Sequence, residues 1–192
     1  MGRGKIFVFI QVVFCNFSIY AQFFNLRQPN DSASLVIVVD PHSQVLHLMQ
    51  NFQIIKSYTI STARAGIGCV LDSYKTPSGK HRIQEKIGAG ADYGTIFKSR
   101  INTGLIAEID TSKTGTDHDF ITSRILWLSG EEAGHNKGGH LDSYNRYIYI
   151  HGTHEEGLIG EPVSLGCIRM CNSDIIELFE IVSVGTTVEI LE

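Results

Sequence analysis

The sequence has no excess of basic residues: 16 lysines and arginines are set against 20 aspartates and glutamates, for a formal net charge of -4 at pH 7. Nucleic-acid-binding domains usually carry a basic patch or a strongly basic composition, so this balance argues against a nucleic-acid partner. Internal repeats, low-complexity tracts and long linkers are also absent from the sequence. The 192 residues are enough for one domain with a substantial core, whereas two full domains would be cramped.

The chain also lacks a long uninterrupted apolar run. Its most hydrophobic stretch, "IFVFIQVVFCNFSIYA", is broken by glutamine, asparagine and serine and is short for a membrane span of about 20 apolar residues. Arg3 and Lys5 precede this stretch and a small residue, Ala21, ends it, which is the order of a secretory signal peptide. We predict that residues 1–21 are a signal peptide and that the mature chain is exported to an oxidising compartment.

Cysteine is scarce, with four in the whole chain. Cys15 would leave with the signal peptide, so Cys69, Cys167 and Cys171 would remain. An odd number of cysteines points to one free thiol, which is a candidate for reactivity. The other two, Cys69 and Cys171, would either pair as a disulfide or stay reduced, and the sequence leaves both alternatives open.

The pattern of the remaining chain predicts one mostly β domain over residues 30–192, with one clear helix. The helix is expected over 172–185, where apolar side chains recur on one face and an N-cap precedes them. Pro77 and Gly79 indicate a turn before another short strand, and residues 85–119 give only weak signals. Strands are expected over 34–40, 45–50, 52–62, 120–128, 146–152 and 186–191.

A histidine and a cysteine flank the most glycine-rich part of the C-terminal half. His151 ends a predicted strand, and Cys167 follows 16 positions later (167 − 151), with four glycines and a proline in between. This interval can fold back and bring the two side chains together as a nucleophile and its base. The predicted helix soon after Cys167 would lower the pKa of the thiol through its dipole, and Gly166 would allow a tight turn whose amides face an oxyanion.

Two other interpretations of these residues stay open. The cysteine could be buried in a turn while the histidine merely caps a strand. A zinc site is the second alternative, with His151, His154, Cys167 and Cys171 as four possible ligands. Against zinc, the spacing of the two histidines is short for a zinc-finger pair, and free thiols in an exported protein tend to oxidise.

The segments "YIYIHGT" and "IGEPVSLGCIRM" together resemble the signature of the L,D-transpeptidase catalytic domain (YkuD type). "KTPSGKHRI" resembles the Thr-Pro-x-Gly turn of that family, and the final "GTTVEIL" fits its C-terminal strand. The resemblance covers essentially the whole expected mature chain. It implies a β-sandwich or barrel with a helix after the catalytic cysteine, and it implies a periplasmic or cell-envelope location.

The resemblance also implies catalytic roles. Cys167 would attack the carbonyl of an L-centre to D-Ala bond in a peptidoglycan stem peptide, and His151 would act as base and then as acid. Gly152 would hold the imidazole through backbone contacts. The amides around Gly166 and Cys167 would form the oxyanion hole, and Ser164 would hydrogen-bond within the loop.

Further roles concern the substrate. Arg169 would pair with a carboxylate of the stem peptide, with a surface ion pair as the alternative, and Thr153 would line the cleft. His154 would either line the cleft as well or be a solvated loop residue. An amine of a neighbouring stem peptide or a wall-anchored protein would resolve the thioester. No metal or organic cofactor is required, and a monomer is expected.

Leu165 departs from the family pattern, which has histidine between the Ser/Thr and the Gly. Because the upstream histidine of the pattern is retained as His151, we expect the chemistry to survive beside a less polar cleft. Two alternatives remain: a hydrolase that passes the acyl group to water, and a non-catalytic binding protein on the same scaffold.

Overall fold

The computed structural model describes residues 34–192, so the predicted signal peptide at 1–21 lies outside the described residues. Ten strands form one sheet: β1 (Leu35–Asp40), β2 (Val45–Gln50), β3 (Gln53–Ser61), β4 (Gly79–Ile87), β5 (Thr95–Lys98), β6 (Ile101–Ile106), β7 (Ile121–Gly130), β8 (Tyr149–Thr153), β9 (Ile168–Met170) and β10 (Thr187–Ile190). The helices are α2 (Asn172–Ile181) and the short 3-10 turns η1 (Gly139–Leu141) and η2 (Glu156–Leu158).

The sheet closes on itself. Its strand order is β4-β10-β1-β2-β3-β9-β8-β7-β5-β6, and an additional pairing of β4 with β7 joins the two sides into a barrel. The β5–β6 hairpin extends from β7 beyond this closure. Most neighbours pair antiparallel, but β1–β10 and β8–β9 pair in parallel. The expectation of a mostly β barrel with one helix after the cysteine is confirmed.

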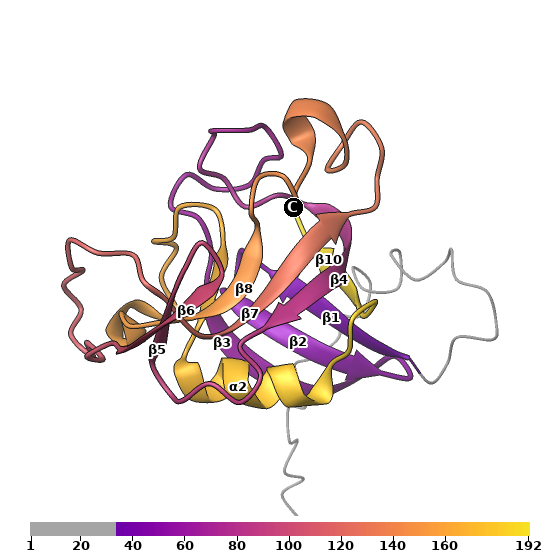
Figure 1. Cartoon of the computed structure of the whole chain (residues 1–192). Coiled ribbons are helices and arrows are strands. Elements are labelled where there is room, and N and C mark those ends of the chain that lie inside the picture. The colour runs from indigo at the N-terminus through magenta and orange to yellow at the C-terminus, as the bar shows by residue number, and fades with distance from the viewer. Residues whose placement is uncertain (1–33) are drawn as a thin grey trace, which may run out of the picture. The chain divides into compact units, whose positions relative to one another are not determined.

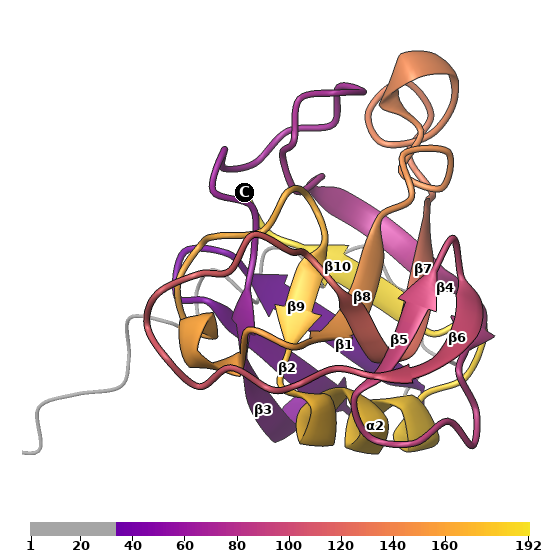
Figure 2. The ribbon, with the colours of Figure 1, turned by 60° about the vertical axis from the view of Figure 1, so that its left-hand side comes forward.

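Helix α2 covers one end of the barrel, and the loops between β3 and β4 and between β7 and β8 lie at the other end (Figure 1, Figure 2). Its apolar face packs into the main core, where Ile175 and Leu178 are fully buried beside Val188 and Ile150. Each such side chain contributes about 1.5–3 kcal/mol by burial. The helix ends at Ile181, earlier than expected, because Val182 is already extended. Among residues 34–192, no helix is long and apolar enough to cross a membrane.

Strands β7 and β8 are covered on both faces. Leu126 and Ile150 point into the barrel core, whereas Ile125 and Tyr149 join Trp127 in a second apolar cluster outside it. This alternation follows from the two-residue period of a strand. The second cluster is the surface against which Cys167 packs.

Three strands were not expected from the sequence. β5 and β6 fall in the weakly patterned interval 85–119, and β9 has only three residues between the cysteine and the helix. The first residues of the expected strand 146–152 form a turn instead, and β8 begins at Tyr149. The very short β9 matters most, because it fixes where Cys167 lies.

Candidate active site

The parallel pairing of β8 with β9 places His151 and Cys167 on one face. His151 is paired with Arg169, and Ile150 is paired with Ile168. Both isoleucines point into the barrel core. Since side chains alternate along a strand, His151 and Arg169 point to the opposite face. Cys167, just before β9, lies on that side too, because it packs against the second apolar cluster. The sequence prediction that the glycine-rich interval brings histidine and cysteine together therefore has a specific structural basis.

Backbone contacts anchor the returning loop. The amide of Gly160 donates to the carbonyl of Ile60, and the amide of Ser164 donates to the carbonyl of Thr62, both at 2.9 Å. Gly166 then adopts a φ of 130°, a conformation that side chains other than glycine rarely take. This turn delivers Cys167 to the start of β9.

His151 is held as a neutral base. Its side chain is 2% exposed, and Nδ1 lies 2.8 Å from the carbonyl oxygen of Gly152. With a proton on Nδ1 donated to that carbonyl, Nε2 is left as the acceptor. Burial lowers the pKa of His151 to about 4, while the nearby Asp119 carboxylate opposes the shift. The Gly152 contact expected from the resemblance is thus made by its carbonyl.

Gly152 has a second role that the sequence did not reveal. A Cβ at this position would lie 2.6 Å from Asn172 Oδ1 and 2.6 Å from the carbonyl oxygen of Thr122. Asn172 is fully buried, and its Oδ1 accepts hydrogen bonds from the hydroxyls of Thr122 and Ser123. Only glycine therefore lets this network approach the strand that carries His151.

The Cys167 thiol is protonated in the resting site. Its Sγ donates to the carbonyl oxygen of Tyr147 at 3.4 Å, and Tyr147 itself has a φ of 57°. Burial raises the pKa of the Cys167 thiol to about 12, although the backbone of Tyr149 and the cations of Arg169 and Arg146 lower it. Within residues 34–192 no hydrogen bond joins this thiol to the His151 imidazole. The site thus holds a neutral thiol and a neutral imidazole on one face of the sheet.

The expected lowering of the thiol pKa by a helix dipole is wrong. Strand β9 stands between Cys167 and α2, and the residue at the N-cap of the helix is Cys171. The dipole effect falls off within the first turn of a helix, so it does not reach Cys167. The pKa of Cys171 is itself raised to about 11, first by burial and then by Glu156 and Asp174.

Arg169 is buried and already paired. Its side chain is 5% exposed, with Nη2 2.7 Å from Asp119 Oδ1 and Nη1 2.9 Å from Glu155 Oε2. A substrate carboxylate would have to displace one of these partners, so the arrangement argues against the expected direct contact with the stem peptide. The alternative of a surface ion pair is also wrong, because the Glu155 side chain is only 6% exposed. Sequence patterns had singled out neither Asp119 nor Glu155.

Three further candidate residues, Thr153, His154 and Ser164, make hydrogen bonds within the protein. Thr153 is fully buried, and its hydroxyl accepts from the amide of Glu155, so it does not line an open cleft. His154 is 4% exposed and hydrogen-bonds to the Thr116 hydroxyl at 2.9 Å, so it is not a solvated loop residue. The Ser164 hydroxyl donates to the carbonyl of Cys167 at 2.6 Å, in keeping with its expected loop role.

The oxyanion donors are fewer than expected. The Gly166 amide donates to the Ser164 hydroxyl at 3.3 Å, and the Gly166 carbonyl accepts from the Thr76 hydroxyl at 3.0 Å. The amide of Cys167 is the remaining candidate. Leu165, at the tip of this turn, is 61% exposed, so its side chain fills no interior space that a histidine would need.

The structure does not gather the ligands of the alternative zinc site. His151 and Cys167 share a face of the sheet, whereas His154 bonds to Thr116 and Cys171 caps α2. Residues 34–192 hold no cluster of three or more histidine, cysteine or acidic side chains arranged for a metal ion.

The disulfide considered between Cys69 and Cys171 is also not formed. Cys69, Cys167 and Cys171 are all free thiols. Cys171 adjoins α2, whereas Cys69 lies in the loop between β3 and β4, at the opposite end of the barrel (Figure 1, Figure 2). Cys69 and Cys171, the two cysteines considered as a disulfide pair, are therefore separate thiols.

Comparison with known proteins identifies related chains. The family model of the L,D-transpeptidase catalytic domain (YkuD) matches residues 34–190. Curated relatives named L,D-transpeptidase YkuD, from Bacillus subtilis and Bacillus licheniformis, are 47% and 45% identical over 60 residues, or 29% of this chain. These alignments span only 37% and 36% of the relatives' own lengths.

Solved structures share the fold at low sequence identity. L,D-transpeptidase 3 from Mycobacterium tuberculosis, in complex with a faropenem-derived adduct, has a TM-score of 0.51 and 16% identity, covering 83% of this chain and 60% of that one. The Bdellovibrio bacteriovorus protein Bd1075 has a TM-score of 0.52 and 17% identity, covering 83% of this chain and 48% of that one.

Proposed function

Because the chain belongs to the L,D-transpeptidase catalytic domain family, we propose that it is an exported cysteine acyltransferase acting on peptidoglycan stem peptides. The observation that carries the proposal is the β8–β9 pairing, which puts the Cys167 thiol and the His151 imidazole on one face of the sheet. A thiol beside a base held by a third group is the constellation that nucleophilic acyl transfer requires.

Acylation begins with the two neutral partners. Sγ of Cys167 leaves the Tyr147 carbonyl and attacks the carbonyl carbon of the bond between an L-centre and D-Ala. Nε2 of His151 accepts the thiol proton during the attack, since Nδ1 is directed to Gly152. The same proton then passes to the departing nitrogen, so that D-Ala leaves as an amine and the stem peptide remains as a thioester on Cys167.

The second half transfers the acyl group to an amine. The acceptor nitrogen attacks the thioester carbon, Nε2 of His151 takes a proton from it, and the Cys167 thiol is restored when that proton returns to sulfur. A side-chain amine of a neighbouring stem would give a 3-3 cross-link, and an amine of a wall-anchored protein would give attachment. The Cys167 amide stabilises the oxyanion in both halves.

Two side chains behind His151 support this chemistry without contacting substrate. Asp119 stabilises the imidazolium that forms transiently, because its carboxylate favours the charged form of His151. Arg169 fixes Asp119 through the 2.7 Å ion pair, although its own charge lowers the pKa of His151. The N-terminal pattern of residues 1–21 supports action at the cell envelope, where the substrate is found.

Purified protein incubated with a stem tetrapeptide tests the proposal by mass spectrometry. We expect release of D-Ala, a covalent adduct on Cys167 and a cross-linked dimer, all abolished in Cys167→Ala. An adduct followed only by hydrolysed tripeptide would identify a hydrolase, and the absence of D-Ala release in the native chain would indicate a binding protein. Faropenem is a simpler probe, because a protein of the same fold holds a faropenem-derived adduct.

A further inference from the structure

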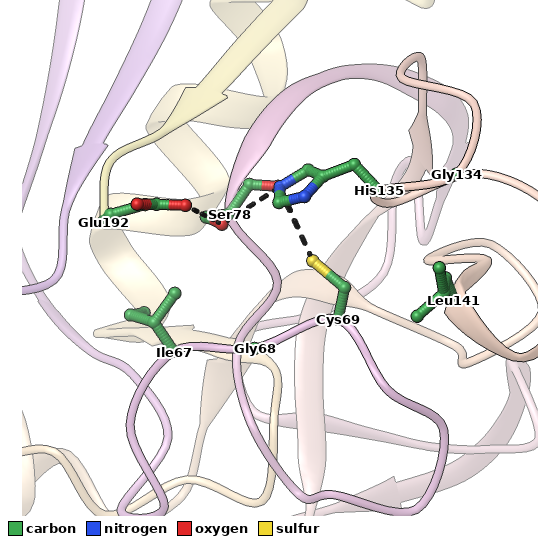
Figure 3. A pocket seen from close by; sticks show the side chains of 8 residues that line it. All are labelled: Ile67, Gly68, Cys69, Ser78, Gly134, His135, Leu141 and Glu192. Carbon is green, nitrogen blue, oxygen red and sulfur yellow. Dashed lines mark hydrogen bonds between the residues drawn. The ribbon is translucent and has the colours of Figure 1, made fainter.

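A second cysteine–histidine cluster lies apart from Cys167. Cys69 Sγ is 3.7 Å from His135 Nε2, and the same nitrogen is 3.2 Å from Ser78 Oγ. The Ser78 hydroxyl lies 3.3 Å from Glu192 Oε1 and donates to it. Figure 3 shows the imidazole between the sulfur and the serine, with the carboxylate beyond. Because the Ser78 hydroxyl donates to Glu192, His135 Nε2 carries a hydrogen, donates to the Ser78 oxygen and also presents its N–H toward the Cys69 sulfur.

Three different parts of the chain supply this cluster. Cys69 and Ser78 both come from the loop between β3 and β4, with Ser78 immediately before β4. His135 comes from the loop between β7 and β8, and Glu192 follows β10. The barrel holds these segments together, because β4 pairs with both β7 and β10. The arrangement is thus fixed by the fold.

The cluster opens into its own cavity of about 450 Å³. Its lining combines the four polar side chains with Ile67, Gly68, Gly134 and Leu141 (Figure 3), and it includes neither Cys167 nor His151. Cys69 is 8% exposed, so its sulfur is reached through this cavity rather than across an open surface. The space suits a small organic group attached to the sulfur.

A cation lies close to Cys69. The guanidinium of Arg146 donates to the carbonyl of Gly68, the residue before Cys69, at 3.3 Å. Burial lowers the pKa of Arg146, and electrostatic interaction with Cys69 opposes that shift. Glu192 places a carboxylate at the other end of the cluster.

We propose that Cys69 is a thiol-modification site, at which a small organic disulfide forms a mixed disulfide with the protein. The Cys69 thiol gives its proton to water, the N–H of His135 Nε2 stabilises the thiolate, and the thiolate attacks one sulfur of the reagent. The reagent's S–S bond breaks as the new one forms, and the departing thiolate takes a proton from water. The Cys69 sulfur is oxidised and half of the reagent is reduced. The Glu192 carboxylate favours cationic reagents over anionic ones.

The sequence makes the measurement direct. Trypsin cuts after lysine and arginine, so Cys69 falls in the peptide 65–75, Cys167 in 147–169 and Cys171 in 170–192. The full chain is exposed to cystamine, a cationic disulfide, for increasing times and the remaining thiols are alkylated at low pH. Mass spectrometry of each peptide then gives a separate rate for each cysteine.

We expect Cys69 in the folded chain to react faster than Cys69 in the urea-unfolded chain, and faster with cystamine than with the anionic glutathione disulfide. His135→Leu, which removes the N–H beside the sulfur, should slow the reaction at Cys69 at least about tenfold while leaving the rate at Cys171 unchanged. Cys167→Ala should leave the Cys69 rate unchanged, which separates this site from the proposed acyltransferase. A Cys69 that reacts no faster folded than unfolded, or at the same rate in His135→Leu, would overturn the proposal.

Discussion

His151 donates from Nδ1 to the carbonyl of its own neighbour, Gly152, at 2.8 Å. The hydrogen bond uses a group that moves with the strand, so the orientation of the imidazole does not depend on a loop. It also fixes which nitrogen is free, since Nε2 is left to take the proton of Cys167. In a Ser-His-Asp triad a carboxylate orients the histidine through Nδ1, and here the Gly152 carbonyl does so.

The pH dependence of acylation should reflect this buried imidazole. Because burial lowers the pKa of His151 to about 4, the ring stays neutral well below the ordinary value of 6.5. We expect the rate of Cys167 acylation to show no loss through pH 6.5 and to fall only as the pH approaches 4. Faropenem adduct formation followed by mass spectrometry gives this profile, and a half-maximal rate near pH 6.5 would contradict it.

Stability should show acid sensitivity from another histidine. Burial lowers the pKa of His81 from 6.5 to about 4. Between these values the unfolded chain binds more protons than the folded chain, so the free energy of unfolding rises with pH and is lost as the pH falls from 6.5 toward 4. Urea midpoints at neutral and mildly acidic pH measure the loss, and His81→Gln should flatten it. His151 contributes with the same sign, so some acid sensitivity remains in that variant.

The sequence predicted most of the barrel strands well, because strands depend on local patterns. The apolar run over 45–50 gave β2 with the observed bounds. The pairing of His151 and Cys167 as base and nucleophile stays a prediction, which the glycines between them make possible. The sequence could not predict β9, because a strand of three residues is too short to show an alternating pattern. Without β9, Cys167 was placed next to a helix dipole, and its thiol pKa was expected to shift in the wrong direction.

The surroundings of Arg169 were equally hidden. Its partners Asp119 and Glu155 lie 50 and 14 positions away in the sequence (169 − 119 and 169 − 155), and Asp119 falls in a stretch without periodicity. Motif position suggested a substrate ligand, whereas burial and pairing are decided by tertiary packing. The family motif alone therefore did not reveal that the charged side chain of Arg169 is buried.

The Arg169 pairs predict unequal effects of substitution. Arg169→Met would leave the buried Glu155 carboxylate without its cation, and we expect a loss of about 3–5 kcal/mol in the free energy of unfolding. Asp119→Asn should cost less than about 1 kcal/mol, because Asp119 is partly exposed and Glu155 still pairs with Arg169. Urea unfolding of both variants measures the difference. Equal losses in the free energy of unfolding of the two variants would contradict the idea that burial makes Glu155 depend more strongly than Asp119 on the Arg169 cation.

Restoring histidine at position 165 tests the departure from the family pattern. Since Leu165 is 61% exposed, we expect Leu165→His to change the free energy of unfolding by no more than about 0.5 kcal/mol. D-Ala release should be present in both chains, with a shift in which amine is used as acceptor. Leu165→Ala is the matched control for loss of the apolar side chain. Activity that appears only in Leu165→His would mean that the native chain is not a working enzyme.

Gly152→Ala should damage stability and chemistry together. The new Cβ would lie 2.6 Å from Asn172 Oδ1 and from the Thr122 carbonyl, both of them buried, so β8 or the Asn172 network must shift. We expect a loss of about 1–3 kcal/mol in the free energy of unfolding. Because His151 takes its orientation from the Gly152 carbonyl, the rate of Cys167 acylation should also fall in the variant that remains folded. Asn172→Ala with Gly152→Ala removes one of the two clashes, so the double variant should lose less stability than the two single losses added together. Strictly additive losses would show that Gly152 and Asn172 do not constrain one another.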